Sequence, residues 1–134
     1  MIVRSIFLKF RYFIATKIWI LFENTNKICI FLQRVFNGGG RIERECAAGS
    51  GRMDLGIEYN DHRYIIEIKL VHQHDSPQTV REEGLEQISA YRDTYSPDAP
   101  AYLLIFDRRL KTKEKSWDER IVWEQDGDVT VLGC

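Results

Sequence analysis

Two acidic residues and one lysine interrupt segments that are otherwise rich in Ile, Leu and Tyr. If Asn60–Asp61 is the two-residue turn of a β-hairpin, residues whose numbers add to 121 lie opposite each other. Asp54 then faces Glu67, with a Cβ separation of about 4.5–5.5 Å. Lys69 points to the same face as Glu67, because alternate residues of a strand share a face. The spacing therefore predicts one patch that holds two carboxylates and an ammonium group.

This patch suits a divalent cation. Two carboxylates that lie so close repel each other unless a cation neutralises them, and hard cations such as Mg²⁺ and Mn²⁺ prefer oxygen ligands. A neighbouring ammonium group can position water or offset the charge that develops on an attacked phosphate. A salt-bridged, exposed strand face is the alternative interpretation. A register slip by one residue would instead put Asp54 opposite Ile68 and separate the two acids.

The first half of the chain is expected to place this patch on a sheet. Residues 25–37 carry apolar side chains at helical spacing and precede three glycines, which predicts a helix. Apolar and aromatic runs separated by turn residues predict three strands, at 41–46, 52–59 and 62–70. A loop is expected at 71–78.

The second half is expected to cover and extend that sheet. A capping box at 79–82 predicts the start of a helix that runs to about Tyr95. The continuous apolar run at 101–106 predicts a buried strand. Asp126–Gly127 predicts the turn of a C-terminal β-hairpin, with strands at 120–123 and 129–132. The predicted order is helix, three strands, helix, strand and hairpin, which makes an α/β fold.

Composition limits the partners and the number of domains. The 134 residues suit one domain, and the net charge of −1 excludes a strongly basic nucleic-acid binder. Three widely spaced cysteines indicate neither a disulfide framework nor a zinc site, so a reducing cytoplasm without disulfide partners is expected. The domain is expected at 24–134.

The N-terminal segment 1–23 differs from the rest, since it is apolar and carries a net charge of +3. Basic residues interrupt it too often for a membrane span of about 20 apolar residues, and it lacks the pattern of a secretion signal. It is interpreted as an element that packs on the domain, as a membrane-surface helix, or as a segment outside the domain.

Asp54 followed by Glu67-Ile68-Lys69 resembles the motif of the PD-(D/E)xK nucleases, whose restriction-endonuclease-like core is helix, three strands, helix, strand. Gln87 and Tyr91, at i and i+4 of the predicted helix, resemble the QxxxY motif of RecB-type nucleases. Over residues 28–134 the closest resemblance is to the nuclease-like domain that follows a AAA-type ATPase in many bacterial proteins. Two departures are Arg52-Met53, where many members have a proline before the aspartate, and the lack of a GxxxxGK[ST] phosphate loop.

The resemblance implies metal-dependent hydrolysis of phosphodiester bonds, with DNA as the expected substrate and Mg²⁺ or Mn²⁺ as the cofactor. Nucleic acid is the implied partner, and the family context adds an ATPase as a second one. The implied roles are metal binding by Asp54, Glu67 and the carbonyl of Ile68, water positioning by Lys69, and support of the site by Gln87 and Tyr91.

Some polar residues allow two interpretations. Arg108 and Arg109 begin a basic run that is either a solvated loop or a contact for substrate phosphates. His72 and His74 are either part of an exposed loop or a metal pair. Candidates for a further upstream acid are Glu23, Glu43 and Glu45.

Two other function classes remain open at this point. The chain can be a catalytically silent nuclease-fold module, or the remnant of an ATPase–nuclease protein, that binds nucleic acid or a protein partner. It can also be a membrane-surface protein that uses residues 1–23. A metal-dependent cleavage assay distinguishes the first of these from a nuclease, and flotation with liposomes tests the second.

Overall fold

The computed structural model describes residues 40–44, 47–48, 51–52, 55–59, 61–120 and 122–133. The chain divides into two units, Met1–Gly39 and Gly40–Cys134, and the described residues all belong to the second unit. The segment 1–23, the predicted helix at 25–37 and the predicted domain start at residue 24 therefore lie outside the described residues. So does Asp54. Among the helices that are described, none is long and apolar enough to span a membrane.

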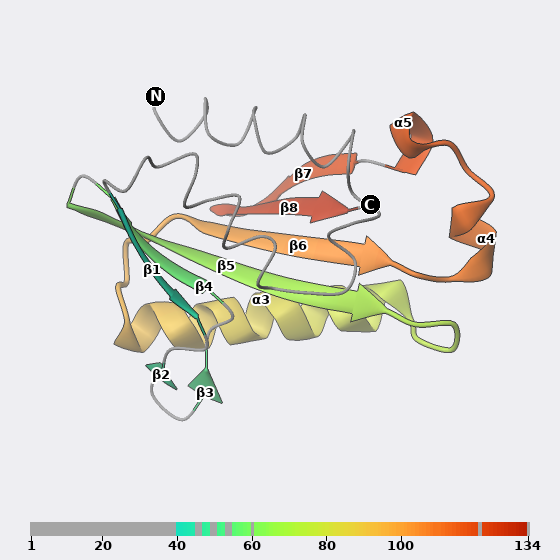
Figure 1. Cartoon of the computed structure of the whole chain (residues 1–134). Coiled ribbons are helices and arrows are strands. Elements are labelled where there is room, and N and C mark those ends of the chain that lie inside the picture. Colours follow the sequence, from blue (N-terminus) through green and yellow to red (C-terminus); the bar gives the residue numbers. More distant parts are fainter. Residues whose placement is uncertain are drawn as a thin grey trace. The chain divides into compact units, whose positions relative to one another are not determined.

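A mixed sheet of six strands forms the centre of the described unit, in the order β1-β4-β5-β6-β8-β7 (Figure 1). The strands β5, β6 and β8 run parallel, whereas the pairs β1–β4, β4–β5 and β7–β8 are antiparallel. A separate two-stranded ribbon pairs β2 with β3. The bounds are β1 Gly40–Arg44, β2 Ala47–Ala48, β3 Gly51–Arg52, β4 Leu55–Tyr59, β5 His62–Val71, β6 Ala101–Asp107, β7 Val122–Asp126 and β8 Val129–Gly133.

The β4–β5 hairpin has the register that its turn predicts. Tyr59 pairs with His62 and Leu55 pairs with Ile66, so the numbers of facing residues add to 121. Asp61 has a φ of 62°, in the left-handed region that a tight two-residue turn requires. Of the strand expected over 52–59, the described residues Leu55–Tyr59 form β4, Arg52 belongs to β3, and residues 53–54 lie outside the described residues.

The helix α3 (Pro77–Thr94) follows β5 and starts earlier than the sequence predicts. Ser76 is its N-cap, and the Ser76 hydroxyl accepts a hydrogen bond from the Thr79 N–H at 3.4 Å. Pro77 occupies the first helical position, where the lack of an N–H does no harm. The capping box predicted at 79–82 is therefore wrong, since Thr79 already lies inside the first turn.

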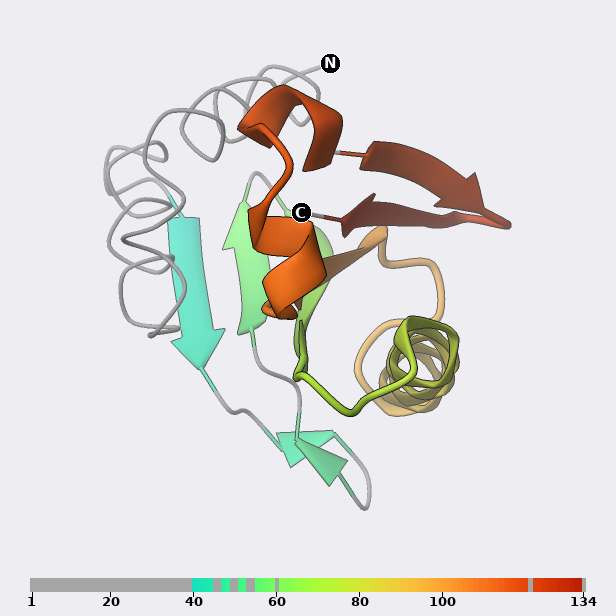
Figure 2. The ribbon, with the colours of Figure 1, turned by 90° about the vertical axis from the view of Figure 1, so that its right-hand side faces the viewer.

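α3 covers one face of the sheet, as Figure 2 shows with the helix seen nearly end-on. Alternate residues of three parallel strands meet the helix there: Ile65 and Val71 of β5, Leu103 and Ile105 of β6, and Val129 and Val131 of β8. The helix contributes Ile88 and Tyr91 to the same core. This packing is closest at Gly84, where an added Cβ would lie 2.6 Å from Leu103 Cδ1.

We expect Gly84→Ala to lower the free energy of unfolding by about 1 kcal/mol. Alanine gains about 1 kcal/mol of helix propensity, but overpacking a filled core costs about 1–3 kcal/mol. Leu103 is fully buried, so its methyl groups have little room to move aside. Denaturant titration measures the change, and Leu103→Val should recover part of it in a double-mutant cycle. Ser89→Ala, at an exposed position of α3, is the control and should not destabilise. A Gly84→Ala variant more stable than the wild type would contradict the close approach.

The stretch between β6 and β7 differs from its prediction. The basic run was expected as a loop, but it includes the short helix α4 (Leu110–Lys113), and α5 (Trp117–Arg120) follows it. Arg120 therefore ends a helix and does not begin a strand. The expected C-terminal hairpin is found in part: β7 and β8 pair antiparallel, and their turn is Gly127–Asp128, one residue later than predicted. Gly127 has a φ of +58°, which favours glycine.

Ion pairs tie this C-terminal pair of strands to α3. Arg81 binds Glu124, and its Nη2 lies 3.3 Å from Asp126 Oδ2. Arg92 Nη1 lies 2.7 Å from Asp128 Oδ1. Because Arg81 and Arg92 lie three turns apart on α3, they hold β7 and its turn along much of the helix.

Candidate functional site

Glu67 and Lys69 lie in the middle of β5, on the face that α3 covers. They alternate with Ile65 and Val71, which are buried against α3, so strand geometry directs all four side chains to the same face. Glu67 is 4% exposed and is the buried charged residue among the described positions. The Lys69 side chain is 19% exposed, so its ammonium group keeps some access to water.

The two groups form an ion pair with a long separation. Lys69 Nζ lies 3.8 Å from Glu67 Oε1, which is longer than a hydrogen bond. Moving a carboxylate out of water is costly, and buried carboxylates in proteins are paired with cations or bind metals. Glu67 is therefore placed where positive charge is needed, and Lys69 supplies part of it.

The contacts that hold the end of α3 show which residues of the helix lie beside Glu67. Arg63 Nη1 donates to the Tyr95 carbonyl at 3.1 Å, and the Arg63 guanidinium lies 5.1 Å from the centre of the Tyr95 ring. The end of α3 is thus fixed beside the start of β5. From Arg63 to Glu67 the strand advances about 13 Å, which equals about nine residues of helix. Counting back from Tyr95 along the antiparallel helix leads to Glu86, the neighbour of Gln87.

The same arithmetic holds at the other end of the helix. From Arg63 to Val71 the strand advances about 26 Å, or about 18 helical residues, which leads back to Pro77, where α3 begins. The register between β5 and β6 agrees as well, because Glu67 pairs with Leu103, the residue that contacts Gly84. Gly84 and Gln87 are separated by one turn of α3.

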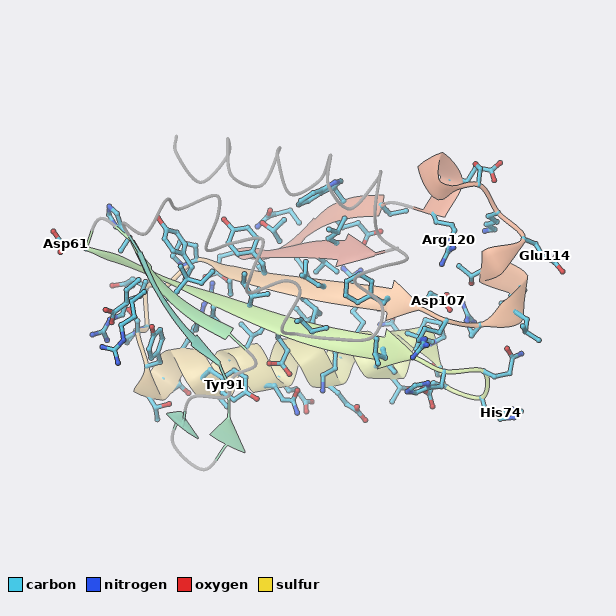
Figure 3. All side chains as sticks on the ribbon, viewed as in Figure 1. Asp61, His74, Tyr91, Asp107, Glu114 and Arg120 are labelled. Atoms are coloured by element: carbon cyan, nitrogen blue, oxygen red, sulfur yellow. The ribbon has the colours of Figure 1, made fainter. Side chains whose placement is uncertain are left out.

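Gln87 is half-buried, and its Oε1 atom is fully buried. Within the part of the chain that the structure describes, no donor forms a hydrogen bond to this oxygen. A buried amide oxygen that lacks a donor costs about 1–3 kcal/mol, so this position is suited to an additional donor such as a bound water. Tyr91, one turn further along α3, is 5% exposed and packs in the core between helix and sheet (Figure 3).

The two other residues of the predicted metal site are Ile68, which the structure describes, and Asp54, which it does not. Ile68 lies between Glu67 and Lys69 on β5 and pairs with Leu104, so its backbone lies within the predicted site. Asp54 lies outside the described residues, and its position opposite Glu67 stays a prediction. Over the described ranges, no three residues among His, Cys, Asp and Glu gather in a way that could hold a metal ion. The predicted site has only two carboxylates, one of them from Asp54.

The described neighbours of β5 differ along its length. β4 pairs with β5 as far as Ile66, whereas β6 pairs with β5 up to Val71. In the described residues, the stretch from Glu67 to Val71 is therefore flanked by a strand on one side only.

The structure places Arg108 and Arg109 away from Glu67, just after β6. Asp107, which ends β6, pairs with Val71, four strand residues or about 13 Å beyond Glu67. Arg109 forms a two-pronged contact with Asp107, with Nε to Oδ1 at 2.9 Å and Nη2 to Oδ2 at 2.7 Å. The Arg108 N–H donates to the Val71 carbonyl at 2.8 Å. The two arginines thus follow the carboxyl end of β6, about 13 Å beyond the level of Glu67.

The Asp107 carboxylate is stabilised in its charged form. Burial by itself raises its pKa, but hydrogen bonds from the Arg109 side chain and N–H and from Thr112 outweigh it and hold the pKa below its ordinary value. A lowered pKa contributes stability above the pKa of the unfolded chain, and this contribution is lost as the pH falls through the folded value. Asp107 was not singled out in the sequence, although an Asp-x-Arg pair directly after a buried strand is a detectable signal.

We expect Asp107→Asn to destabilise the protein at pH 7 by about 1–3 kcal/mol, because it removes a charged hydrogen-bonded pair. The difference from wild type should be constant from pH 8 to pH 5 and should shrink below about pH 4, where the Asp107 carboxylate becomes protonated first in the unfolded chain. Denaturant titrations across this pH range measure it. Asp98→Asn, at an exposed position, should have little effect. A difference that grew on acidification would contradict the assignment.

Comparison with protein-family models matches residues 22–103 to the PD-(D/E)XK nuclease superfamily. No curated protein and no solved structure matches the chain. The match covers more than half of the 134 residues and includes the whole of β5 and α3. The mixed α/β sheet with its flanking helix fits the restriction-endonuclease-like fold of that group. On this match, the chain belongs to the PD-(D/E)XK nuclease superfamily.

Proposed function

We propose that this chain is a metal-dependent nuclease that hydrolyses phosphodiester bonds, with DNA as its substrate. The observation that carries the proposal is the nearly buried Glu67 carboxylate, with Lys69 Nζ at 3.8 Å. Membership of the superfamily supports a nuclease fold and a nucleic-acid ligand.

Glu67, Asp54 and the backbone carbonyl of Ile68 are the groups that would hold Mg²⁺ or Mn²⁺. Members of the superfamily generally use divalent metals, and oxygen atoms are the ligands that these hard cations prefer. The fit is supported by the burial of Glu67, since a carboxylate withdrawn from water gains most from a cation. When bound, such a cation polarises the phosphate and lowers the pKa of bound water.

Lys69 acts on water and on charge. A protonated ammonium group has three donors and no lone pair, so it is not a metal ligand. Its place beside Glu67, with part of its surface open to solvent, suits a group that orients the attacking water. The same positive charge offsets the negative charge that develops on the phosphate oxygens in the transition state.

Gln87 and Tyr91 form the RecB-type pair of this proposal. The buried Gln87 Oε1 accepts a hydrogen bond from water at the site, and the packed ring of Tyr91 holds that part of α3 against the sheet. From the resemblance to the domain that follows AAA-type ATPases, we also propose an ATPase as protein partner and the cytoplasm as the location.

The test is a cleavage assay on single-stranded DNA, double-stranded DNA and RNA, each with Mg²⁺, with Mn²⁺ and with EDTA. We expect cleavage of DNA that requires the metal and that Glu67→Gln abolishes. Glu58→Gln is a matched control. Glu58 belongs to the same hairpin but lies away from the site, where its Oε1 is 3.1 Å from Arg63 Nε. If no nucleic acid is cleaved under any condition, the chain is a silent nuclease-fold module and the proposal fails.

A further inference from the structure

A cavity of about 530 Å³ lies at the carboxyl ends of the parallel strands, where Figure 3 labels Asp107 and Arg120. Val71, Asp107 and Gly133, at or near the ends of β5, β6 and β8, contribute to its wall. The start of α3, the α4–α5 segment and β7 close the sides. A cavity of this size is in the range of small-molecule sites, which often lie at the carboxyl ends of parallel strands.

The lining of this cavity is basic although the chain as a whole is slightly acidic. Its charged residues comprise five cations and three anions, which gives a formal excess of +2, against −1 for the whole chain. The cations are Arg81, Arg109, Lys111, Lys115 and Arg120, and the anions are Asp107, Glu119 and Glu124. The five cations come from five separate elements or loops, so the fold gathers this positive charge at one place.

Two of the arginines in the lining are held in place by acidic side chains and still have N–H donors available for a ligand. Arg109 contacts Asp107 through Nε and Nη2, and nothing in the described ranges accepts a hydrogen bond from its Nη1. Arg81 is fixed through Nη1 and Nη2 by Glu124 and Asp126. The hydrogen bond with Asp107 raises the pKa of Arg109, so its guanidinium stays charged. Pre-positioned guanidinium groups are effective donors to phosphate.

Three further features of the rim carry positive charge. Considering only described positions, neither Lys111 nor Lys115 forms an ion pair. Pro77 and Gln78 also line the cavity, at the start of the 18-residue helix α3. The first turn of α3 has no acidic residue, so the positive end of its dipole is not neutralised from within the helix. An anion bound in the cavity would interact favourably with Lys111, with Lys115 and with the positive end of α3.

We propose that this cavity binds a phosphate monoester, either of a free nucleotide or at the end of a nucleic-acid strand. A terminal phosphate carries a charge of about −1.5 to −2 near pH 7, which matches the excess of the lining, whereas a backbone phosphodiester carries only −1. The affinity for a free nucleotide does not depend on the proposed nuclease function. Only the strand-end form rests on that function, since it would place a strand terminus about 13 Å from Glu67.

The test is titration calorimetry of the full chain in EDTA, so that no metal can bridge a ligand to Glu67. The probes are AMP and one oligonucleotide prepared with a 5′-phosphate or a 5′-hydroxyl. We expect AMP and the 5′-phosphorylated oligonucleotide to bind, and the 5′-hydroxyl form to bind at least about tenfold more weakly. Tighter binding of AMP identifies a nucleotide site, and tighter binding of the oligonucleotide identifies a strand-end site.

Variants locate the binding. Lys111→Gln combined with Lys115→Gln changes two exposed residues, so the fold should persist, and it should weaken AMP binding at least about tenfold. Arg41→Glu lowers the net charge by the same amount on β1, at the opposite edge of the sheet, and should bind like wild type. The inference fails if AMP does not bind, if the double variant binds it normally, or if the 5′-hydroxyl oligonucleotide binds as well as the phosphorylated one.

Discussion

Lys69→Met should reduce the rate of DNA cleavage by about 10²–10³ while the affinity for Mn²⁺ and for DNA changes by no more than a few fold. Methionine keeps the length and the apolar stem of lysine but has no donors and no charge. Lys69 lies beside Glu67 and retains access to water, so its loss removes water positioning and charge stabilisation together. Single-turnover cleavage measures the rate, and calorimetry measures metal binding.

The fold should survive this substitution, because methionine keeps the apolar stem of Lys69 beside Ile65 and Val71, which are fully buried on the same strand. Lys69→Arg is the informative companion: it restores the charge but not the geometry, so it should recover only a small part of the rate. If Lys69→Met cleaves as fast as the wild type, Lys69 is a structural partner of Glu67 and has no part in the reaction.

Glu67→Gln should weaken Mn²⁺ binding at least tenfold, roughly 1.4 kcal/mol, and should abolish measurable cleavage. Glutamine has the shape of glutamate but lacks the charge, so it is a much poorer ligand for a hard cation. The metal-free protein should still unfold cooperatively, since the buried position loses a charge that was costly to desolvate. Calorimetry with Mn²⁺ and a thermal melt in EDTA measure the two effects.

A purely structural role for the Glu67–Lys69 ion pair predicts the opposite effects on stability and on Mn²⁺ binding. If Glu67 served only to neutralise Lys69, Glu67→Gln would destabilise the metal-free protein and leave Mn²⁺ binding unchanged. Glu58→Gln removes a more exposed carboxylate from the same hairpin, one that pairs with Arg63, and should change neither quantity by much. Asp54→Asn should weaken Mn²⁺ binding like Glu67→Gln if both acids share the cation.

The parts of the fold that could be predicted from the sequence are those with a strong local signal. The long apolar runs give β5 and β6 to within about a residue, and the two-residue turn after Tyr59 gives the register of β4 with β5. The start of α3 was missed because two capping signals follow each other, and Ser76 with Pro77 prevails over Thr79. α4 was missed because its position depends on a distant contact, in which the Leu110 N–H donates to Gln73 Oε1.

The candidate site was predictable to the same extent. Strand alternation places Glu67 and Lys69 on one face, and this needs no tertiary information. The burial of Glu67 could not be foreseen, because it arises when α3 crosses over to bring β6 alongside β5 in parallel. The basic cavity was missed for a similar reason. Arg81 and Arg120 are remote in sequence, and only the tertiary fold brings both to the wall of the same cavity.

β5 and the β2–β3 ribbon have different neighbours, and this difference separates what must stay fixed from what can vary over evolution. Up to Ile66 the strand is enclosed by β4 and β6, so an insertion there would shift the register and move Glu67 to the wrong face. The β2–β3 ribbon, in contrast, pairs outside the six-stranded sheet and contacts α3 (Figure 1). Descendants of this chain can therefore lengthen or reshape the ribbon, and with it the surroundings of α3, while Glu67 and Lys69 keep their positions.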